Sequence, residues 1–315
     1  MQTQPVLVLG GNGFVGRHLC SALIAAGYAV RLPTRHPDRA ADLRVLPGLE
    51  IVAADVNDPG TLTALARGCR AVINLVGILN ERGRSGAGFQ RAHAEFAEKL
   101  VAACRSAGVR RLLQMSGLPA SVNGPSHYLR SKGAAEATLR AAADLEVTIF
   151  RPSVIFGRGD SFINRFAGLL RPLPVLPLAR IEARLQPVYV GDVVAAFLFA
   201  LKERATIGRS YDLVGPEVMT LGAIVRYVRD RLGLHRLVFG LPDGLGALQA
   251  WLLEWLPGKP LSLDNFRSLA AASTSDANGL VELGVTPTPL EAVVPGYLGA
   301  DARTLRLRDN RRHRV

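Results

Sequence analysis

The chain is poor in the residues that mark disulfide-rich and metal-binding proteins. Its 315 residues include three cysteines, Cys20, Cys69 and Cys104, and no two of them form a C-x-x-C pair. So few and scattered cysteines argue against a disulfide framework or a zinc site. We expect all three to be buried and unpaired, as in a reducing cytosol. Histidines and carboxylates also lack metal-ligand spacing, so we predict no metal site.

Long apolar runs are also missing. The first run, residues 6–9, is too short for a signal peptide and follows no basic segment. The most apolar stretch, residues 245–256, contains Gln249 and Glu254 and falls short of a membrane span. No G-x-x-x-x-G-K-S/T loop and no nucleic-acid-binding motif is present. We therefore predict a cytoplasmic globular protein that does not bind nucleic acid.

Aspartate and glutamate are fewer than lysine and arginine, which gives the chain a formal net charge of +12. The excess of positive charge is concentrated in residues 301–315, which contain six arginines and two aspartates. Such a surface attracts anionic partners without distinguishing them. We expect a solvated, disordered basic tail. The alternative is contact with anionic lipid at the inner face of the cell membrane or with an acidic partner.

The first half alternates short apolar runs with helical patterns. Strands are expected at 5–9, 29–33, 49–53, 71–75, 111–115 and 146–150, and helices at 14–26, 61–67, 89–107 and 126–143. This alternation predicts an α/β fold with a Rossmann-type, doubly wound parallel sheet. We place a dinucleotide-binding domain at 1–156 and the basic tail at 301–315.

The regular alternation of strands and helices ends after Arg151. Prolines 172, 174, 177 and 187 surround a segment without a clear period, and helices are expected at 191–201 and 221–231. We predict a smaller, mixed C-terminal substrate or lid lobe over 157–300, partly interleaved with the first domain.

Three glycines, Gly10, Gly13 and Gly16, lie where the first strand passes into the first helix. Glycine permits the tight turn, lets the backbone approach a diphosphate and lets helix and strand pack closely. Open amides at the helix N-terminus then bind the diphosphate. A purely structural turn is the alternative. The residues expected to contact the cofactor here are Gly10, Asn12, Gly13, Phe14, Val15, Gly16 and Arg17.

The end of the second strand carries no acidic residue. Proteins that prefer NAD usually place Asp or Glu there to bind the ribose 2′-hydroxyl, whereas this sequence has Arg35. A guanidinium suits a 2′-phosphate, and Arg17 is a possible second contact. The sequence thus favours NADP(H) over NAD(H), unless Arg35 is only one more surface arginine.

Tyr128 and Lys132 lie four residues apart, on one face of the expected helix 126–143. A neighbouring ammonium favours phenolate, so we expect a lowered pKa for Tyr128 and proton exchange during hydride transfer. The lysine can also bind the nicotinamide ribose. The alternative is an ordinary pair on a surface helix.

With these motifs the sequence resembles the extended or atypical short-chain dehydrogenase/reductase superfamily, the NAD-dependent epimerase/dehydratase-like proteins. Matching segments are residues 10–16, 55–56, 74–77, 151–157, 186–194 and 211–216. The resemblance implies that Asp55 and Val56 contact the adenine. It also implies further cofactor contacts, which fall on Leu75, Val76, Gly77, Tyr128, Lys132, Pro152 and Val154.

A narrower resemblance is to bacterial relatives of the NADPH-binding accessory subunit of respiratory complex I, a group that includes proteins linked to ubiquinone metabolism. It is carried by residues 74–80, 89–93, 128–132, 162–166 and 185–189. This resemblance implies tight NADPH binding without implying turnover. Three functions stay open: hydride chemistry on an unknown small-molecule or quinone-related substrate, a non-catalytic accessory or assembly role, and a nucleotide-sensing regulator.

One departure from the family bears on catalysis. Extended members usually carry Ser or Thr two residues beyond the first serine after the fifth strand, and this sequence has Leu118 there. Ser116 is then the serine expected to polarise a substrate carbonyl, although it lies deep at the strand end. Ser121 and Ser126 are weaker substitutes.

Five further residues have a structural interpretation that we favour. His93 is expected to pack or hydrogen-bond within its helix, and Asp192 to cap the helix that follows it. Asp160 reads as a helix start that could also reach the substrate pocket. Trp251 and Trp255 are expected in the core. The alternative for this aromatic helix is an interface with a membrane or a respiratory complex.

Overall fold

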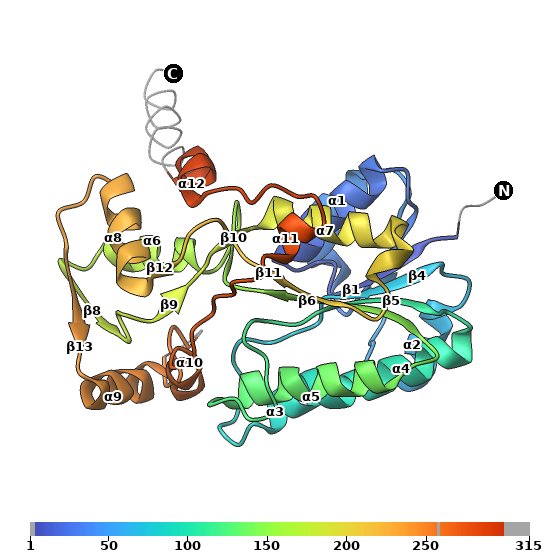
Figure 1. Ribbon diagram of the computed structural model, residues 1–315, viewed down its shortest axis with the longest axis horizontal. Helices are drawn as coiled ribbons and strands as arrows, with labels where there is room; N and C mark the ends of the chain where they lie inside the picture. The colour runs from blue at the N-terminus through green and yellow to red at the C-terminus, as the bar shows by residue number, and fades with distance from the viewer. Residues whose placement is uncertain (1–3, 257–258, 299–315) are drawn as a thin grey trace.

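The computed structural model describes residues 4–256 and 259–298, and a seven-stranded parallel sheet forms its centre (Figure 1). The strand order is β11-β6-β5-β4-β1-β2-β3, and every neighbouring pair runs parallel. The strands are β1 (Val6–Leu9), β2 (Val30–Thr34), β3 (Leu49–Ala53), β4 (Ala71–Asn74), β5 (Arg111–Met115), β6 (Glu146–Pro152) and β11 (Ser210–Leu213). This topology confirms the doubly wound Rossmann-type fold.

Helices cover both faces of the sheet, because alternate residues of each central strand point to opposite sides. In β1, Val6 and Val8 join one core cluster while Leu7 and Leu9 join the other. One face carries α1 (Phe14–Ala25), α7 (Val190–Lys202) and α11 (Gly279–Glu282). The other carries α2 (Pro59–Ala66), α4 (Phe96–Ala107) and α5 (His127–Ala141), as Figure 1 shows.

The long helix expected at 89–107 is not a regular α-helix throughout. It begins as α3 (Ala87–Gln90), widens into a π-helix, η2 (Arg91–Glu95), and continues as α4. Such π-turns occur mostly as single turns inside α-helices and often at functional sites. Here the π-turn contains the buried residue His93. The 3-10 helix η1 (Pro37–Val45) follows β2.

The second half forms a smaller lobe with its own apolar core. Its strands pair two by two: β7 (Ile155–Phe156) with β10 (Val188–Tyr189), β9 (Arg184–Leu185) with β12 (Met219–Thr220), and β8 (Val175–Ala179) with β13 (Leu237–Leu241). Its helices are α6 (Ile163–Leu170), α8 (Leu221–Arg231), α9 (Asp243–Leu253), α10 (Leu263–Ser268) and α12 (Leu290–Leu298). The 3-10 helix η3 (Arg204–Thr206) precedes β11.

The two halves interleave. Strand β11 pairs with β6 at the edge of the main sheet, and α7 packs on the same face as α1. Side chains of both elements, Val193, Phe197 and Leu213, join the core cluster that contains Val6 and Val8. The sheet is therefore completed by residues far along the chain.

The cysteine prediction is confirmed, since Cys20, Cys69 and Cys104 are buried and free. Burial raises the pKa of the Cys20 and Cys104 thiols to about 12, so neither is a nucleophile near neutral pH. None of the helices within 4–256 and 259–298 combines the length and apolar character needed to cross a bilayer. The basic tail expected at 301–315 lies outside the described residues.

Candidate functional site

The glycine turn between β1 and α1 has the geometry of a diphosphate cradle. Gly10 has a φ of +76°, and its carbonyl accepts a hydrogen bond of 3.0 Å from the Gly13 amide. A Cβ on Gly16 would come within 2.5 Å of the Gly10 oxygen, so only glycine allows this packing. No side chain caps α1 at Gly13, which leaves the amides of its first turn open for an anion.

Arg35 follows the end of β2, and its side chain is exposed. In the sheet Thr34 is aligned with Ala53, so Arg35 and Asp55 follow the ends of adjacent strands. Hydrogen bonds from Asn57 lower the pKa of Asp55, with a smaller effect from the charge of Arg35. Both residues predicted to contact the adenosine half therefore lie at the same edge of the sheet.

Arg17 lies in the same region, but its contacts do not support the expected role beside a 2′-phosphate. Its Nε donates to the Asn12 carbonyl at 3.1 Å. Its terminal nitrogens contact the Asp42 carboxylate and the Arg39 carbonyl. The guanidinium is thus already paired, and it holds η1 against the start of α1.

The turn after β4 connects the glycine turn to the predicted catalytic residues. A Cβ on Gly10 would lie 3.1 Å from the Leu75 carbonyl and 3.2 Å from the Val76 nitrogen. A Cβ on Gly77 would lie 3.3 Å from Lys132 Nζ. Residues 75–77 therefore lie next to both Gly10 and Lys132.

Tyr128 and Lys132 lie in the first half of α5, beside the end of β5. Lys132 is 4% exposed, and its Nζ donates to the Met115 carbonyl at 3.3 Å. The Tyr128 hydroxyl lies so close to Gly117 that a Cβ there would be 2.9 Å from it. The structure thus brings both side chains to the carboxyl end of the sheet.

The expected lowering of the Tyr128 pKa was wrong. Burial raises the pKa of Tyr128 to about 12, and burial lowers the pKa of Lys132 to about 8. Moving either group from water into the protein disfavours its charged form. Tyr128 is therefore protonated near neutral pH.

Ser116 is 5% exposed, and its Oγ is buried without a hydrogen-bond partner among the described residues. Its amide donates to the Phe150 carbonyl, which fixes it at the end of β5. Ser126, one of the proposed substitutes, is fully buried and caps α5 by accepting from the Leu129 amide at 3.1 Å. Ser121 is exposed in the preceding loop.

His93 supports the site structurally, as expected. Its Nε2 accepts from the Ile78 amide at 3.2 Å, and its Nδ1 lies 2.8 Å from the Ser131 hydroxyl, which donates to the Tyr128 carbonyl. Burial, with a smaller effect from Lys132, lowers the pKa of His93 to about 2. A neutral histidine accepting from a backbone amide holds the turn after β4 against α5.

Of the two aspartates expected at helix starts, Asp160 has the expected role and Asp192 does not. Asp160 starts α6 as expected, because its Oδ1 accepts from the Ile163 amide at 2.6 Å. Asp192 is not an N-cap, since α7 begins earlier and Tyr189 is its cap residue. The Asp192 carboxylate instead accepts from the amide and hydroxyl of Thr288.

Pro152 and Val154 lie near the same edge of the sheet. The Pro152 carbonyl accepts from the Leu118 amide at 2.8 Å, and the Val154 carbonyl accepts from the Val188 amide at 2.9 Å. They join the end of β6 to the loop after β5 and to the second lobe.

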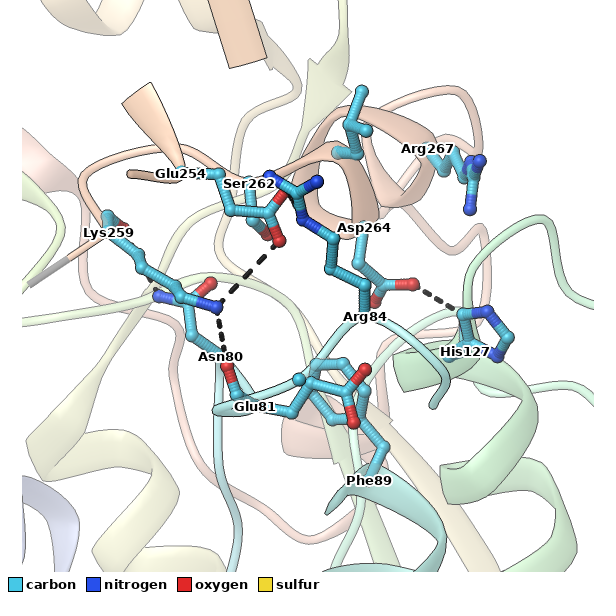
Figure 2. A pocket seen from close by; sticks show the side chains of 12 residues that line it. Asn80, Glu81, Arg84, Phe89, His127, Glu254, Lys259, Ser262, Asp264 and Arg267 are labelled. Atoms are coloured by element: carbon cyan, nitrogen blue, oxygen red, sulfur yellow. Dashed lines mark hydrogen bonds and ion pairs between the residues drawn. The ribbon is translucent and has the colours of Figure 1, made fainter. Parts of the chain in front are cut away.

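A cavity of about 150 Å³ lies between the two lobes, next to the first turn of α5 (Figure 2). From one side it is lined by Asn80, Glu81, Gly83, Arg84, Phe89 and His127, and from the other by Glu254, Lys259, Ser262, Leu263, Asp264 and Arg267. Lys259 Nζ crosses between the lobes, donating to the Glu81 carbonyl at 2.8 Å and lying 3.8 Å from a Glu254 oxygen.

The sequence analysis assigned none of these cavity residues to a site, although Asn80 and Phe89 belong to segments that carry the narrower family resemblance. A polar cluster after β4, including Glu81, could have been noticed, because loops at this edge carry ligand contacts. Glu254 and Asp264 carry no such signal, because Arg84, which pairs with Glu254, and the amides that Asp264 binds lie far away in the chain.

The aromatic helix is not core, contrary to the favoured expectation. Trp251 is 41% exposed and Trp255 is 69% exposed. The other exposed apolar side chains of α9 and the turn after it are Leu245, Leu248, Leu252 and Leu256. Their spacing places most of them on one face of α9, which no described residue covers.

Comparison with known proteins agrees with this geometry. A family model described as NAD(P)H-binding matches residues 10–160. The NADH dehydrogenase (ubiquinone) 1 alpha subcomplex subunit 9, mitochondrial, of Arabidopsis thaliana is 34% identical over 92% of this chain and 76% of that protein. A ceramide reductase of Caulobacter vibrioides is 34% identical over 60% of this chain and 58% of that protein.

Among solved structures, a UDP-glucose 4-epimerase of Thermotoga maritima has the same fold, with a TM-score of 0.75 and 19% identity over 96% of this chain and 99% of that one. Fold, glycine turn and family model together define an NAD(P)-binding protein of the extended short-chain dehydrogenase/reductase type. Within that class, the chain belongs to the family of the 1 alpha subcomplex subunit 9 of NADH dehydrogenase (ubiquinone).

Proposed function

We propose that the chain is an NADPH-dependent oxidoreductase in which Tyr128 and Lys132 act on a carbonyl substrate. One observation carries this proposal: helix α5 places a buried ammonium beside Gly77, in the turn after β4, and a tyrosine hydroxyl beside Gly117, in the turn after β5. When bound, the nicotinamide supplies the hydride. The substrate lies, in this proposal, between the Rossmann part at 1–156 and the lobe at 157–300.

The protonation states favour the reductive direction. Tyr128, with its pKa raised by burial to about 12, holds a proton that it can donate to a carbonyl oxygen as the carbinol forms. The Lys132 ammonium then stabilises the phenolate that remains and offers hydrogen bonds to ribose hydroxyls. A proton from water restores the tyrosine.

Cofactor preference rests on Arg35. None of the residues at the end of β2, which are Thr34, Arg35 and His36, is a carboxylate that could bind a 2′-hydroxyl, and the exposed Arg35 guanidinium suits a 2′-phosphate. Arg35→Ala should weaken NADPH binding about ten-fold or more and leave NADH binding nearly unchanged. Arg44→Ala is the control, and equal losses for both nucleotides would refute the preference.

Turnover is tested by NADPH oxidation with a panel of carbonyl compounds that includes keto forms of ceramide and short-chain quinones. Because one similar protein is a ceramide reductase, the lipid compounds of the panel are tested first. Tyr128→Phe should lower kcat at least about 100-fold. Tyr227→Phe removes the hydroxyl of a tyrosine in α8, outside the candidate site, and should keep full activity. Activity that survives Tyr128→Phe would remove the tyrosine from the mechanism.

A non-catalytic accessory role is the second candidate, and a specific observation favours it. Leu118 stands at the position of the usual electrophile, and the Ser116 hydroxyl is buried. The family relationship to a respiratory complex subunit points the same way. Tight NADPH binding without oxidation by any compound of the panel would establish this role instead.

The uncovered face of α9 supports peripheral attachment to an anionic membrane. Trp255 is the most exposed of its large side chains, and Arg84 lies 4.7 Å above the centre of the Trp255 ring. Exposed tryptophan and leucine beside arginine suit a lipid headgroup layer, and the net charge of +12 adds attraction.

Vesicle sedimentation tests this attachment. The protein should bind vesicles of phosphatidylcholine and phosphatidylglycerol more tightly than phosphatidylcholine alone, and salt should weaken the binding. Leu248→Ser with Trp255→Ser should reduce it, whereas Val45→Ser, an exposed apolar residue in η1, should not. Binding that is equal for all variants would exclude α9 as the membrane contact.

A further inference from the structure

The first turn of α5 is held by a carboxylate from the other lobe. The Asp264 side chain, in α10, accepts hydrogen bonds from the amides of His127 at 2.7 Å and Tyr128 at 3.1 Å. Figure 2 shows Asp264 beside His127, with a dashed line for the hydrogen bond between them. Both oxygens of one carboxylate are thus bound to the first two amides of the helix that carries Tyr128 and Lys132.

Two neighbours of Asp264 strengthen this contact between α10 and the main domain. Ser268 donates to the hydroxyl of the cap residue Ser126 at 2.8 Å. Asn265 donates to the Leu79 carbonyl, in the loop after β4, at 3.1 Å. The start of α10 is itself fixed by a capping box between Ser262 and Asn265. Helix α10 therefore presents three fixed side chains to two segments of the candidate site.

The position of the Tyr128 hydroxyl depends on the backbone of this first turn. The ring is packed edge-on by Phe89 and His93, with ring centres 6.0 and 5.6 Å away. The hydroxyl lies close to the Gly117 Cα, where a Cβ would come within 2.9 Å of it. Because Tyr128 is attached to the backbone of this first turn, a shift of the turn would move the ring against these neighbours and displace the hydroxyl from its place beside Gly117.

We propose that Asp264 is a positioning residue for Tyr128. The inference rests on the proposed function, because it assigns a role in proton transfer to a residue that itself binds only backbone amides. A negative charge at a helix N-terminus is favourable, so the carboxylate both orients and stabilises the first turn. A shift of α10, in the second lobe, would then also shift the Tyr128 hydroxyl.

The test compares Asp264→Ala, Asp264→Asn and Asp264→Glu in the full chain. Asparagine offers one acceptor where two amides need one each, whereas glutamate keeps both oxygens. Asp230→Asn is the control, since Asp230 is an exposed carboxylate of the same lobe, paired with Arg229. Hydrogen exchange at the amides of residues 127–129, NADPH affinity, kcat and KM are measured with the panel compound that turns over.

We expect faster exchange confined to residues 127–129 in the Ala and Asn variants. Their kcat should fall about 10- to 100-fold, as expected for a misplaced proton donor, with NADPH affinity unchanged within about two-fold. Asp264→Glu should recover part of kcat, and Asp230→Asn should match the wild type.

Unchanged exchange at residues 127–129 would overturn the proposal, and so would equal losses of kcat and NADPH affinity in all three variants. If the wild type oxidises NADPH with no compound, the proposed function has failed. A role of Asp264 in proton transfer is then excluded. The exchange data still show whether Asp264 fixes the first turn of α5.

Discussion

Burial decides the ionisation of the groups beside the end of β5. The pKa of Lys132 is lowered to about 8, that of Tyr128 is raised to about 12 and that of His93 is lowered to about 2. Each shift favours the neutral form, because low-dielectric surroundings disfavour charge. Of the three, only Lys132 changes charge within the range of ordinary enzyme assays.

NADPH affinity should therefore depend on pH through Lys132. Above about pH 8 the ammonium loses its proton and one charge-assisted hydrogen bond, so affinity should fall about ten-fold or more between pH 6.5 and 9.5. Fluorescence titration of NADPH measures this. Lys132→Met should bind weakly at every pH, and a wild-type profile as flat as that of the variant would contradict the prediction.

The stability of the nucleotide-free protein should move in the opposite direction. Between about pH 8 and the ordinary lysine pKa of 10.5, the unfolded chain binds a proton that folded Lys132 does not. Rising pH over this window therefore favours folding. Relative to Lys132→Met, the wild type should gain free energy of unfolding there. A loss would show that Lys132 is not desolvated.

At the scale of elements, single polar side chains join helices to distant segments. Asp192, in the first turn of α7, accepts from the Thr288 amide at 2.7 Å and the Thr288 hydroxyl at 2.9 Å. Burial raises the pKa of Asp192, with the bonds from Thr288 opposing this effect. The contact fastens the segment before α12 to a helix that covers the main sheet.

Asp192→Asn should lower the free energy of unfolding by about 1–3 kcal/mol, because one partly buried donor of Thr288 loses its charged acceptor. Thr288→Val removes only the hydroxyl bond and should cost less. Urea denaturation measures both, with the exposed Asp38→Asn as control. A cost for Asp192→Asn no larger than that of the control would show that the contact is unimportant.

At the scale of the whole molecule, the nucleotide-binding sheet depends on both halves of the chain. Phe197 of α7 is fully buried and packs 4.5 Å, centre to centre, from the Phe150 ring of β6. Strand β11 pairs with the outer side of β6. A chain cut after residue 156 would expose one face and one edge of the sheet.

A fragment of residues 1–156 should therefore show no cooperative melting and no measurable NADPH affinity, although it contains the complete glycine turn. Calorimetry and fluorescence titration test this. In the full chain, Phe197→Ala should cost about 3–5 kcal/mol while the fold is retained. A fragment that melts cooperatively and binds NADPH like the full chain would show that the first half folds alone.

Much of the fold was predictable from local pattern. Apolar runs of strand length alternating with helical periods gave six of the seven strands of the main sheet and its main helices. Glycine spacing located the turn at Gly10, because that conformation depends on the residues of the turn itself. The seventh strand, β11, was recognised only as a family motif, because nothing in residues 210–213 specifies pairing with β6.

By itself, the sequence determined the alternation of strands and helices, the glycine turn, and the spacing of Tyr128 and Lys132. These are local properties, encoded within a few residues. Only the tertiary structure decided the ionisation of Tyr128, the exposure of Trp255 and the contact of Asp264 with α5. Each depends on what packs nearby, and the two amides that Asp264 binds lie 137 and 136 positions away in the chain.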